Sequence, residues 1–299
     1  MRILPRWNVR QHPVGGEVVN LVEEPPRTTD GRRRIILLIH GYNTSKIDAG
    51  EGYDRFVENL AGIGRAGTTI IPDVVEFYWP GDAWSKVRST LDYPEALNRA
   101  AESARRLAEF VIHRPGAPPN DAVRYVLVAH SMGNRVALEF IGNMLQLAQP
   151  SGAVIRAACL MAAAVPVYMV ENNGALRGAA ASVEDTVAMY SPQDSVLECA
   201  FPVGQWGANE GWCEAVGLQG LPTERWRLLQ RMHQGGAGFG HNDYWGSPKT
   251  ARVVATLLGI VERRETPESL VSTRALPSTS EPDELHLASH RLTDRPTLG

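Results

Sequence analysis

The feature that most constrains the fold is a change of hydrophobic period near the middle of the chain. Residues 123–129 (VRYVLVA) are almost all apolar, a run too short for a helix and typical of a buried parallel strand. From Met132 onward, apolar residues recur at three- and four-residue spacings, which predicts a helix with one buried face. A buried strand that leads directly into an amphipathic helix indicates an α/β fold built on a parallel sheet.

The corner between this strand and this helix carries the sequence AHSMG at residues 129–133. A nucleophilic serine must stand above the sheet on a tight turn, so the residues two before and two after it approach closely. Ala129 and Gly133 are small enough for that approach, and the first N–H groups of the helix point toward Ser131. The stretch is a form of the nucleophile elbow, with alanine in its first small position, and it predicts Ser131 as a nucleophile.

The rest of the chain alternates strand and helix patterns around this centre. Apolar or alternating runs predict further strands at 35–39, 68–78, 155–164, 186–190 and 224–232. Apolar residues at helical spacing predict helices at 45–64, 93–113 and 248–261. This alternation predicts an α/β fold with a mostly parallel sheet, flanked by helices on both faces.

The two ends of the chain differ from its centre. Residues 1–34 predict edge strands of the same domain, and 16–22 (GEVVNLV) is the better candidate. After Arg264, Pro, Ser, Thr, Glu and Arg dominate, and the sparse apolar residues show no sustained period. We therefore expect a catalytic domain over 35–264 and a flexible tail over 265–299.

Composition and charge exclude several classes of partner. The formal net charge of −3 gives no electrostatic reason to expect nucleic acid or an anionic membrane as the main partner. No signal peptide is visible and no run approaches about 18 apolar residues, so we expect a cytoplasmic protein without a transmembrane segment. The three cysteines lack metal-ligand spacing, and we expect no metal or other cofactor. A disulfide between Cys199 and Cys213 stays an open alternative.

A serine nucleophile needs a base, and the base needs a carboxylate to orient it. In hydrolases with this elbow the acid and then the histidine follow the serine, on loops that leave the carboxyl ends of strands. Five histidines precede the elbow or lie in the expected tail, and His130 adjoins Ser131 at a turn where neighbouring side chains diverge. His233 ends the expected last strand, whereas His241 lies in the glycine-rich loop after it. We predict His241 as the base, with His233 as the alternative.

Asp194 is the predicted acid. It lies in the sequence YSPQDSV, four residues beyond Tyr190, on the loop that leaves the penultimate strand. Asp185 comes before that strand, at the opposite edge of the sheet, and Asp243 is so close to His241 that we expect it to shape the turn there. The alternative interpretation is that Asp194 only caps its own turn and has no role in catalysis.

The oxyanion hole requires two donors close to the nucleophile. We expect the backbone N–H of Met132, directly after Ser131, to be one of them. The other should come from the loop after strand 35–39, where Gly41 lets the backbone approach closely. Tyr42 N–H is the expected donor, and Asn43 is expected to help through its side chain or backbone.

Four stretches together resemble a bacterial group of largely uncharacterised α/β-hydrolases related to esterases and lipases. They are IILLIHGYNTS, VVEFYWPGDA, YVLVAHSMGNRVALEF and GHNDYW, within residues 35–262. The group carries an H-G-(F/Y)-N-T stretch and an A-H-S-M-G-N elbow. The resemblance implies the α/β-hydrolase fold, a triad and two oxyanion donors, here Ser131, Asp194, His241, Tyr42 and Met132. The chain departs from the group at 165–167 (VPV), where an aspartate is often present.

Specificity should depend on the loops over the carboxyl edge of the sheet. Residues 196–222 form the longest insertion, with several aromatic residues and no clear period, and they predict a partial lid. Trp206 and Trp212 in this insertion are candidate substrate contacts, as are Trp79 and Asn43. An aromatic-rich loop beside a serine nucleophile favours a small-molecule ester with an apolar acyl or aryl group.

The sequence therefore predicts a serine carboxylester hydrolase, esterase- or lipase-like, that works through an acyl-enzyme on Ser131. An acyltransferase, a thioesterase or an amidase could use the same triad, because fold and triad do not separate these activities. A non-catalytic binding module is a third alternative, which the complete triad disfavours. The oligomeric state is not predicted.

Overall fold

The computed structural model describes residues 4–12, 16–27, 29, 31–67, 73–82, 92–114, 122–147, 152–171, 173–220, 232–236 and 238–261. The chain divides into two units, Met1–Glu262 and Arg263–Gly299, and the described residues all belong to the first. The expected tail at 265–299 lies outside the described residues. Its flexibility and the domain boundary at 264 therefore stay predictions.

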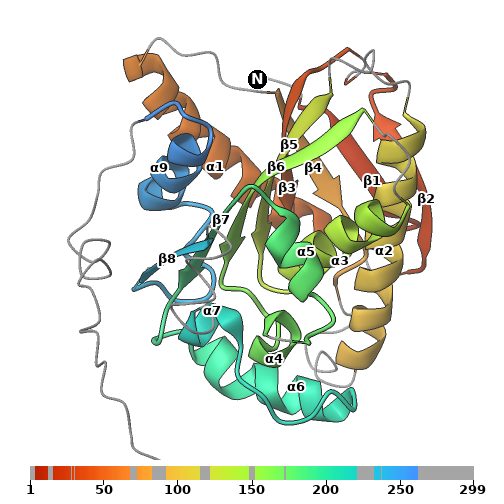
Figure 1. The fold of residues 1–299 in the computed structure, drawn as a ribbon, viewed down its shortest axis with the longest axis vertical. Helices are drawn as coiled ribbons and strands as arrows, with labels where there is room; N and C mark the ends of the chain where they lie inside the picture. The colour runs from red at the N-terminus through yellow and green to blue at the C-terminus, as the bar shows by residue number, and fades with distance from the viewer. Residues whose placement is uncertain are drawn as a thin grey trace, which may run out of the picture. The chain divides into compact units, whose positions relative to one another are not determined.

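The described residues form one eight-stranded sheet in the order β2-β1-β4-β3-β5-β6-β7-β8 (Figure 1). The strands are β1 (Arg6–Arg10), β2 (Val18–Glu24), β3 (Arg34–Ile39), β4 (Asp73–Tyr78), β5 (Val123–His130), β6 (Ala153–Met161), β7 (Asp185–Tyr190) and β8 (Met232–Gly236). All neighbouring strands are parallel except β1 and β2. The prediction of a mostly parallel sheet is confirmed.

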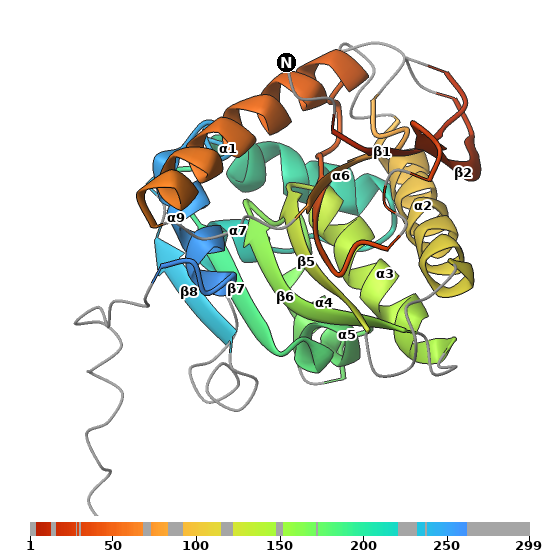
Figure 2. The same ribbon diagram turned by 90° about the horizontal axis from the view of Figure 1, so that it is seen from above.

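Helices cover both faces of this sheet, as predicted (Figure 2). They are α1 (Lys46–Gly67) and α9 (Pro248–Leu257) on one face, and α2 (Tyr93–His113), α3 (Gly133–Gln146) and α5 (Arg177–Ser182) on the other. Ile36 and Leu38 of β3 belong to the buried cluster that includes side chains of α1 and α9. Ile35 and Leu37 belong to the cluster that includes side chains of α2, α3 and α5. Successive residues of the buried strand therefore fill two separate cores.

Two predicted strand positions need correction. Residues 1–34 were expected to form edge strands. Of the hairpin β1 and β2, only β2 is an edge strand, because β1 pairs on its other side with β4. The last strand was expected at 224–232, but β8 begins at Met232, and residues 221–231 lie outside the described part of the chain. β8 continues through a QGG sequence without apolar side chains, so it has no hydrophobic pattern. The position of β8 in the sheet therefore depends on its backbone pairing with β7.

Residues 196–220, here called the capping segment, are more helical than predicted. They contain the π-helix η2 (Val196–Ala200) and the helices α6 (Phe201–Gly207) and α7 (Val216–Gln219). Ser191 N donates to Gly217 O at 2.9 Å and Gly217 N donates to Ala163 O at 2.9 Å, so the segment lies against the carboxyl ends of β6 and β7. The short helix α4 (Val167–Val170) lies at the same edge (Figure 1).

Two further expectations concern cysteines and membrane spans. Cys199 and Cys213 are both free thiols, so the alternative of a disulfide between them is wrong. Of the described helices, none combines the length and the hydropathy needed to cross a membrane.

Candidate active site

The elbow after β5 has a strained backbone at Ser131, the predicted nucleophile. Ser131 has a φ of 53°, in the left-handed region that side chains other than glycine rarely adopt. Its N–H donates to Met161 O at 3.0 Å, and Asn134 Nδ2 donates to Ser131 O at 2.9 Å. These bonds anchor the turn to β6 and to α3, and they hold the serine in its strained conformation.

Two glycines permit the close packing around this turn. A Cβ on Gly133 would lie 2.4 Å from His40 O, and a Cβ on Gly41 would lie 2.7 Å from Ser131 Cβ. Real carbon atoms do not approach so closely, so both positions require glycine. The small residue predicted at 133 is therefore required by the backbone of the loop after β3.

Three side chains from separate loops meet in one hydrogen-bonded series. His241 Nδ1 donates to Asp194 Oδ2 at 2.8 Å, and Ser131 Oγ lies 2.9 Å from His241 Nε2. Because a carboxylate only accepts, Nδ1 carries the proton, and in this tautomer Nε2 can accept from the serine hydroxyl. The structure thus brings together the three residues predicted as nucleophile, base and acid.

The carboxylate of Asp194 is completely buried, and both of its oxygens accept hydrogen bonds. Its Oδ1 accepts from Val196 N at 3.1 Å and from Leu197 N at 3.0 Å, while Oδ2 faces His241. Asp194 therefore both caps η2 and contacts the histidine, so the two alternatives for this residue are compatible. These bonds orient the carboxylate toward the imidazole.

The other candidates for the acid and the base lie outside this hydrogen-bonded series. Asp243 Oδ2 accepts from Gly240 N at 2.8 Å, which confirms the prediction that Asp243 shapes the turn carrying His241. Glu198 is exposed on η2. His233 lies within β8, in register with Val187 of β7, and its side chain is outside the described part of the structure. The described residues contain no cluster of three or more His, Cys, Asp or Glu that could hold a metal ion.

The expected oxyanion donors belong to the residue after Ser131 and to the loop after β3, which packs against Ser131 at Gly41. Met132 is buried at the start of α3, and no described residue accepts a hydrogen bond from its N–H. Tyr42 follows Gly41 on the loop after β3, and its ring packs edge-on against Tyr93 at 5.7 Å. Asn43 N donates to Gly81 O at 2.6 Å, so the backbone N–H of Asn43 is not available to a ligand. Only the side chain of Asn43 stays a candidate contact.

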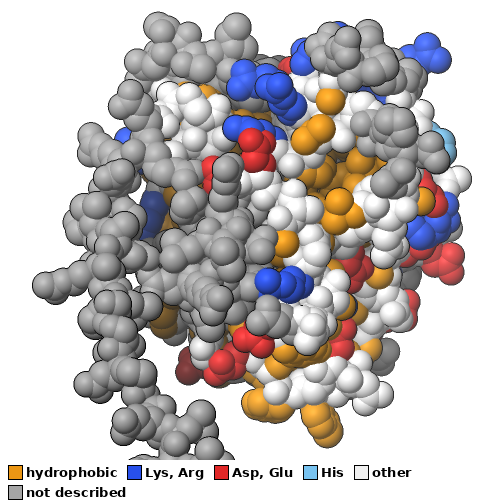
Figure 3. Space-filling model, viewed as in Figure 1, with side chains coloured by type: hydrophobic (Ala, Val, Ile, Leu, Met, Phe, Trp, Pro, Cys, Tyr) orange, Lys and Arg blue, Asp and Glu red, His pale blue; other side chains and the backbone are white. Residues whose placement is uncertain are grey.

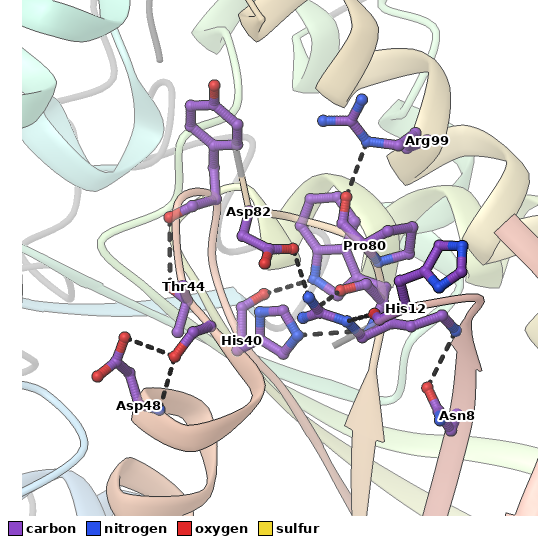
Figure 4. A network of polar contacts seen from close by, with 12 residues as sticks. Asn8, His12, His40, Thr44, Asp48, Pro80, Asp82 and Arg99 are labelled. Carbon is purple, nitrogen blue, oxygen red and sulfur yellow. Dashed lines mark hydrogen bonds and ion pairs between the residues drawn. The ribbon is translucent and has the colours of Figure 1, made fainter. Parts of the chain in front are cut away.

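A buried network that no sequence pattern predicted supports the loop after β3 (Figure 4). Arg10 Nη2 pairs with Asp82 at 2.5 Å, and both side chains are almost fully buried. Arg10 Nη1 also donates to Trp79 O at 3.3 Å, and Trp79 Nε1 donates to His40 O at 2.8 Å. Burial lowers the pKa of His40 to about 3, so this ring is neutral. No local pattern links Arg10 to Asp82, which are 72 residues apart.

The predicted aromatic contacts separate into two groups. Trp79 is fully buried and stacks on His40 at 5.6 Å, so it packs against the start of the loop after β3, and its interpretation as a substrate contact is wrong. Trp206 and Trp212 are 68% and 71% exposed on the capping segment. Hydrophobic side chains are visible at the lower edge of Figure 3, where Figure 1 places α6.

The chain is similar to a known protein family and to several solved structures. The family model described as "Alpha/beta hydrolase family" matches residues 36–297. Similar solved structures include an esterase from Pyrococcus furiosus, at 12% identity and a TM-score of 0.41, covering 77% of this chain and 82% of that one. A peroxisomal alpha-beta-hydrolase from Saccharomyces cerevisiae has 14% identity and a TM-score of 0.44, covering 83% and 85%. A putative hydrolase from Agrobacterium vitis has 13% identity and a TM-score of 0.43, covering 77% and 88%. Among curated proteins, no significant match was found.

Proposed function

Since the chain belongs to the alpha/beta hydrolase family, we propose that it hydrolyses carboxylic esters through an acyl-enzyme on Ser131. The observation that carries this proposal is the series Ser131–His241–Asp194, with hydrogen bonds of 2.9 and 2.8 Å. A serine is a weak nucleophile until a base takes its proton, and the base works best when a carboxylate orients it. The three side chains have the partners and the tautomer that this chemistry needs.

In the acylation step, Ser131 Oγ attacks the ester carbonyl carbon while His241 Nε2 takes the hydroxyl proton. The carbonyl oxygen becomes an oxyanion, to which the N–H groups of Met132 and Tyr42 donate. Asp194 stabilises the imidazolium form of His241. When the tetrahedral intermediate collapses, the C–O bond to the leaving group breaks and Nε2 returns the proton to the departing alcohol.

Deacylation repeats these steps with water as the nucleophile. His241 takes a proton from water, the hydroxide attacks the acyl carbon, and the bond to Ser131 Oγ breaks as the serine regains its proton. A transferase, a thioesterase or an amidase would form the same acyl-enzyme and differ only in leaving group or acceptor. Analysis of the released products distinguishes hydrolysis from transfer.

We assign the substrate to small esters with an apolar acyl or aryl group. The support is the exposed aromatic surface of Trp206 and Trp212 on the capping segment, at the edge of the sheet where Ser131 lies.

The free thiols at Cys159, Cys199 and Cys213 agree with a reducing compartment such as the cytoplasm.

The proposal is tested with a fluorophosphonate probe and a series of p-nitrophenyl esters of increasing acyl length. Wild type should be labelled at Ser131 and should turn over at least one ester, and Ser131→Ala should abolish both. Ser182→Ala is the matched control, because Ser182 Oγ donates to the carbonyl of Ala179 at the end of α5. Labelling that persists in Ser131→Ala would overturn the assignment of the nucleophile.

A further inference from the structure

His130 is a buried titratable residue to which the proposed mechanism gives no task. It is the last residue of β5, directly before Ser131, and it is 5% exposed. Its Nε2 lies 2.6 Å from the backbone carbonyl oxygen of His241, 111 residues later in the chain. The two imidazole rings have centroids 4.9 Å apart and are tilted by 54°.

The partner determines the tautomer of the His130 ring. A backbone carbonyl can only accept, so Nε2 carries the proton and donates. Burial, reinforced by the neighbouring His241, lowers the pKa of His130 to about 3. The ring is therefore a neutral donor, and it adds no positive charge beside His241 when that residue becomes imidazolium.

The bond reaches a turn that is shaped by local hydrogen bonds. Asp243 N donates to Gly240 O at 3.2 Å, and Asp243 Oδ2 accepts from Gly240 N at 2.8 Å. These bonds shape the turn around His241 but do not connect it to the elbow. The bond from His130 connects the main chain of the base directly to the residue before the nucleophile.

We propose that His130 is a positioning residue that fixes the backbone of His241 and so holds its imidazole between Ser131 and Asp194. This inference rests on the proposed function, because it assigns a task within that triad. A catalytic group displaced by about 1 Å can lose on the order of 100-fold in rate. Loss of the donor should therefore lower kcat, while substrate binding changes little.

Three variants separate positioning from simple packing. His130→Leu fills much of the same apolar space without a donor. His130→Gln places its Nε2 the same number of bonds from Cα as the imidazole Nε2, so it can donate to the same carbonyl. His113→Leu is the matched control, since His113 Nδ1 bonds the carbonyl of Glu109 at the exposed end of α2, in the same kind of contact.

The measurements are kcat and KM on one activated ester, melting temperature, and amide hydrogen exchange of residues 238–246. We expect about a 100-fold lower kcat in His130→Leu with KM within about threefold, and faster exchange in the turn. His130→Gln should recover most of kcat and of the protection, and His113→Leu should resemble wild type. Turnover and exchange in a folded His130→Leu that equal wild type would overturn the inference. So would a folded His130→Gln as defective as His130→Leu.

The same experiment distinguishes this inference from the proposed function. If wild type neither reacts with the fluorophosphonate nor cleaves any ester, the proposed function fails. Exchange in the turn then still decides whether the donor at 130 fixes the backbone of His241. If wild type is active and His130→Leu matches it in both readouts, only the inference about His130 fails.

Discussion

Asp194 combines two tasks in one carboxylate, since one oxygen caps η2 and the other faces His241. Asp194→Asn keeps an oxygen for the cap but favours the wrong tautomer of His241, the proposed base. We expect a folded protein whose turnover falls about 10⁴-fold, as the corresponding change does in serine proteases. Turnover of one activated ester, with circular dichroism to confirm folding, measures this.

The controls for Asp194 are two nearby carboxylates in the sequence: Asp243, two residues after His241, and Glu198, four residues after Asp194. Asp243→Asn and Glu198→Gln should keep most of the turnover, because Asp243 bonds Gly240 N and Glu198 is exposed. Near-normal turnover in Asp194→Asn, together with collapse in either of the others, would move the acid away from Asp194.

Gly41 packs directly against Ser131, the proposed nucleophile, so Gly41→Ala tests the packing of the elbow. The added Cβ would lie 2.7 Å from Ser131 Cβ and 3.2 Å from His130 Nδ1. We expect the free energy of unfolding to fall by about 1–3 kcal/mol, as in other overpacked cores, and turnover to fall with it. Urea unfolding and ester turnover check this.

Gly62→Ala on α1 is the matched control for Gly41, because its Cβ would meet open space. An alanine within a helix should raise the free energy of unfolding by about 0.5–1 kcal/mol and leave turnover unchanged. An unaffected Gly41→Ala would mean that the loop after β3 can move away from Ser131 at little cost.

At the scale of elements, Arg135 of α3 connects the elbow helix to the capping segment. Its Nη2 and Nη1 bond the carboxylate of Glu210 at 3.1 and 3.3 Å, and its Nε pairs with Glu139. The side chains of Arg135 and Glu210 are only 14% and 20% exposed, so the pair is well shielded from water. Tyr168 Oη also donates to Glu210 O at 3.1 Å, which ties α4 to the same point.

Replacing Arg135 should lower the free energy of unfolding more than replacing Glu210. Arg135→Gln leaves Glu139 and Glu210 facing each other without a cation, whereas Glu210→Gln leaves Arg135 paired with Glu139. We expect the free energy of unfolding, measured with urea, to fall by about 3 kcal/mol in Arg135→Gln and by about 1 kcal/mol in Glu210→Gln. Proteolysis within residues 196–220 should also be faster in Arg135→Gln.

Arg105→Gln on α2 is the control for this connection. Arg105 also pairs with two carboxylates, Glu102 and Glu109, but its side chain is 42% exposed, and such pairs contribute less than about 1 kcal/mol. If Arg105→Gln and Arg135→Gln are equally destabilised, shielding of the pair is not what gives Arg135 its effect.

For the molecule as a whole, two buried histidines make stability depend on pH. Burial lowers the pKa of both His40 and His130 to about 3, against an ordinary value of 6.5. The unfolded chain therefore binds protons at a pH where the folded protein does not. Their contribution to stability is present above pH 6.5 and is lost as the pH falls toward 3.

At pH 5 each of these histidines should lower the free energy of unfolding by about 2 kcal/mol relative to neutral pH. Burial raises the pKa of Glu76 and of Glu139, which acts with the opposite sign, so variants must be compared with wild type. In urea unfolding at pH 7.5 and pH 5, His130→Gln should reduce the pH dependence by about 2 kcal/mol. A dependence equal to that of wild type would show that His130 titrates normally in the folded protein.

The sequence by itself determined the features that depend on neighbouring residues. The switch of period at Ser131 predicted the strand, the turn and the helix, because burial of one face imposes that pattern locally. The order of loops along the chain then singled out Asp194 and His241 as the residues to meet Ser131. The structure places them within hydrogen-bonding distance of one another.

Only the tertiary structure decided which partner each buried group meets. Trp79 appeared suited to a substrate wall but is stacked on His40, and Arg10 meets Asp82 across 72 residues. The capping segment is helical without a hydrophobic period, since η2 begins where Asp194 accepts from its first N–H groups. A period indicates that a side chain is buried, but the geometry of the packed elements selects its partner. For the same reason, the bond from His130 to the backbone of His241 has no counterpart in the sequence pattern.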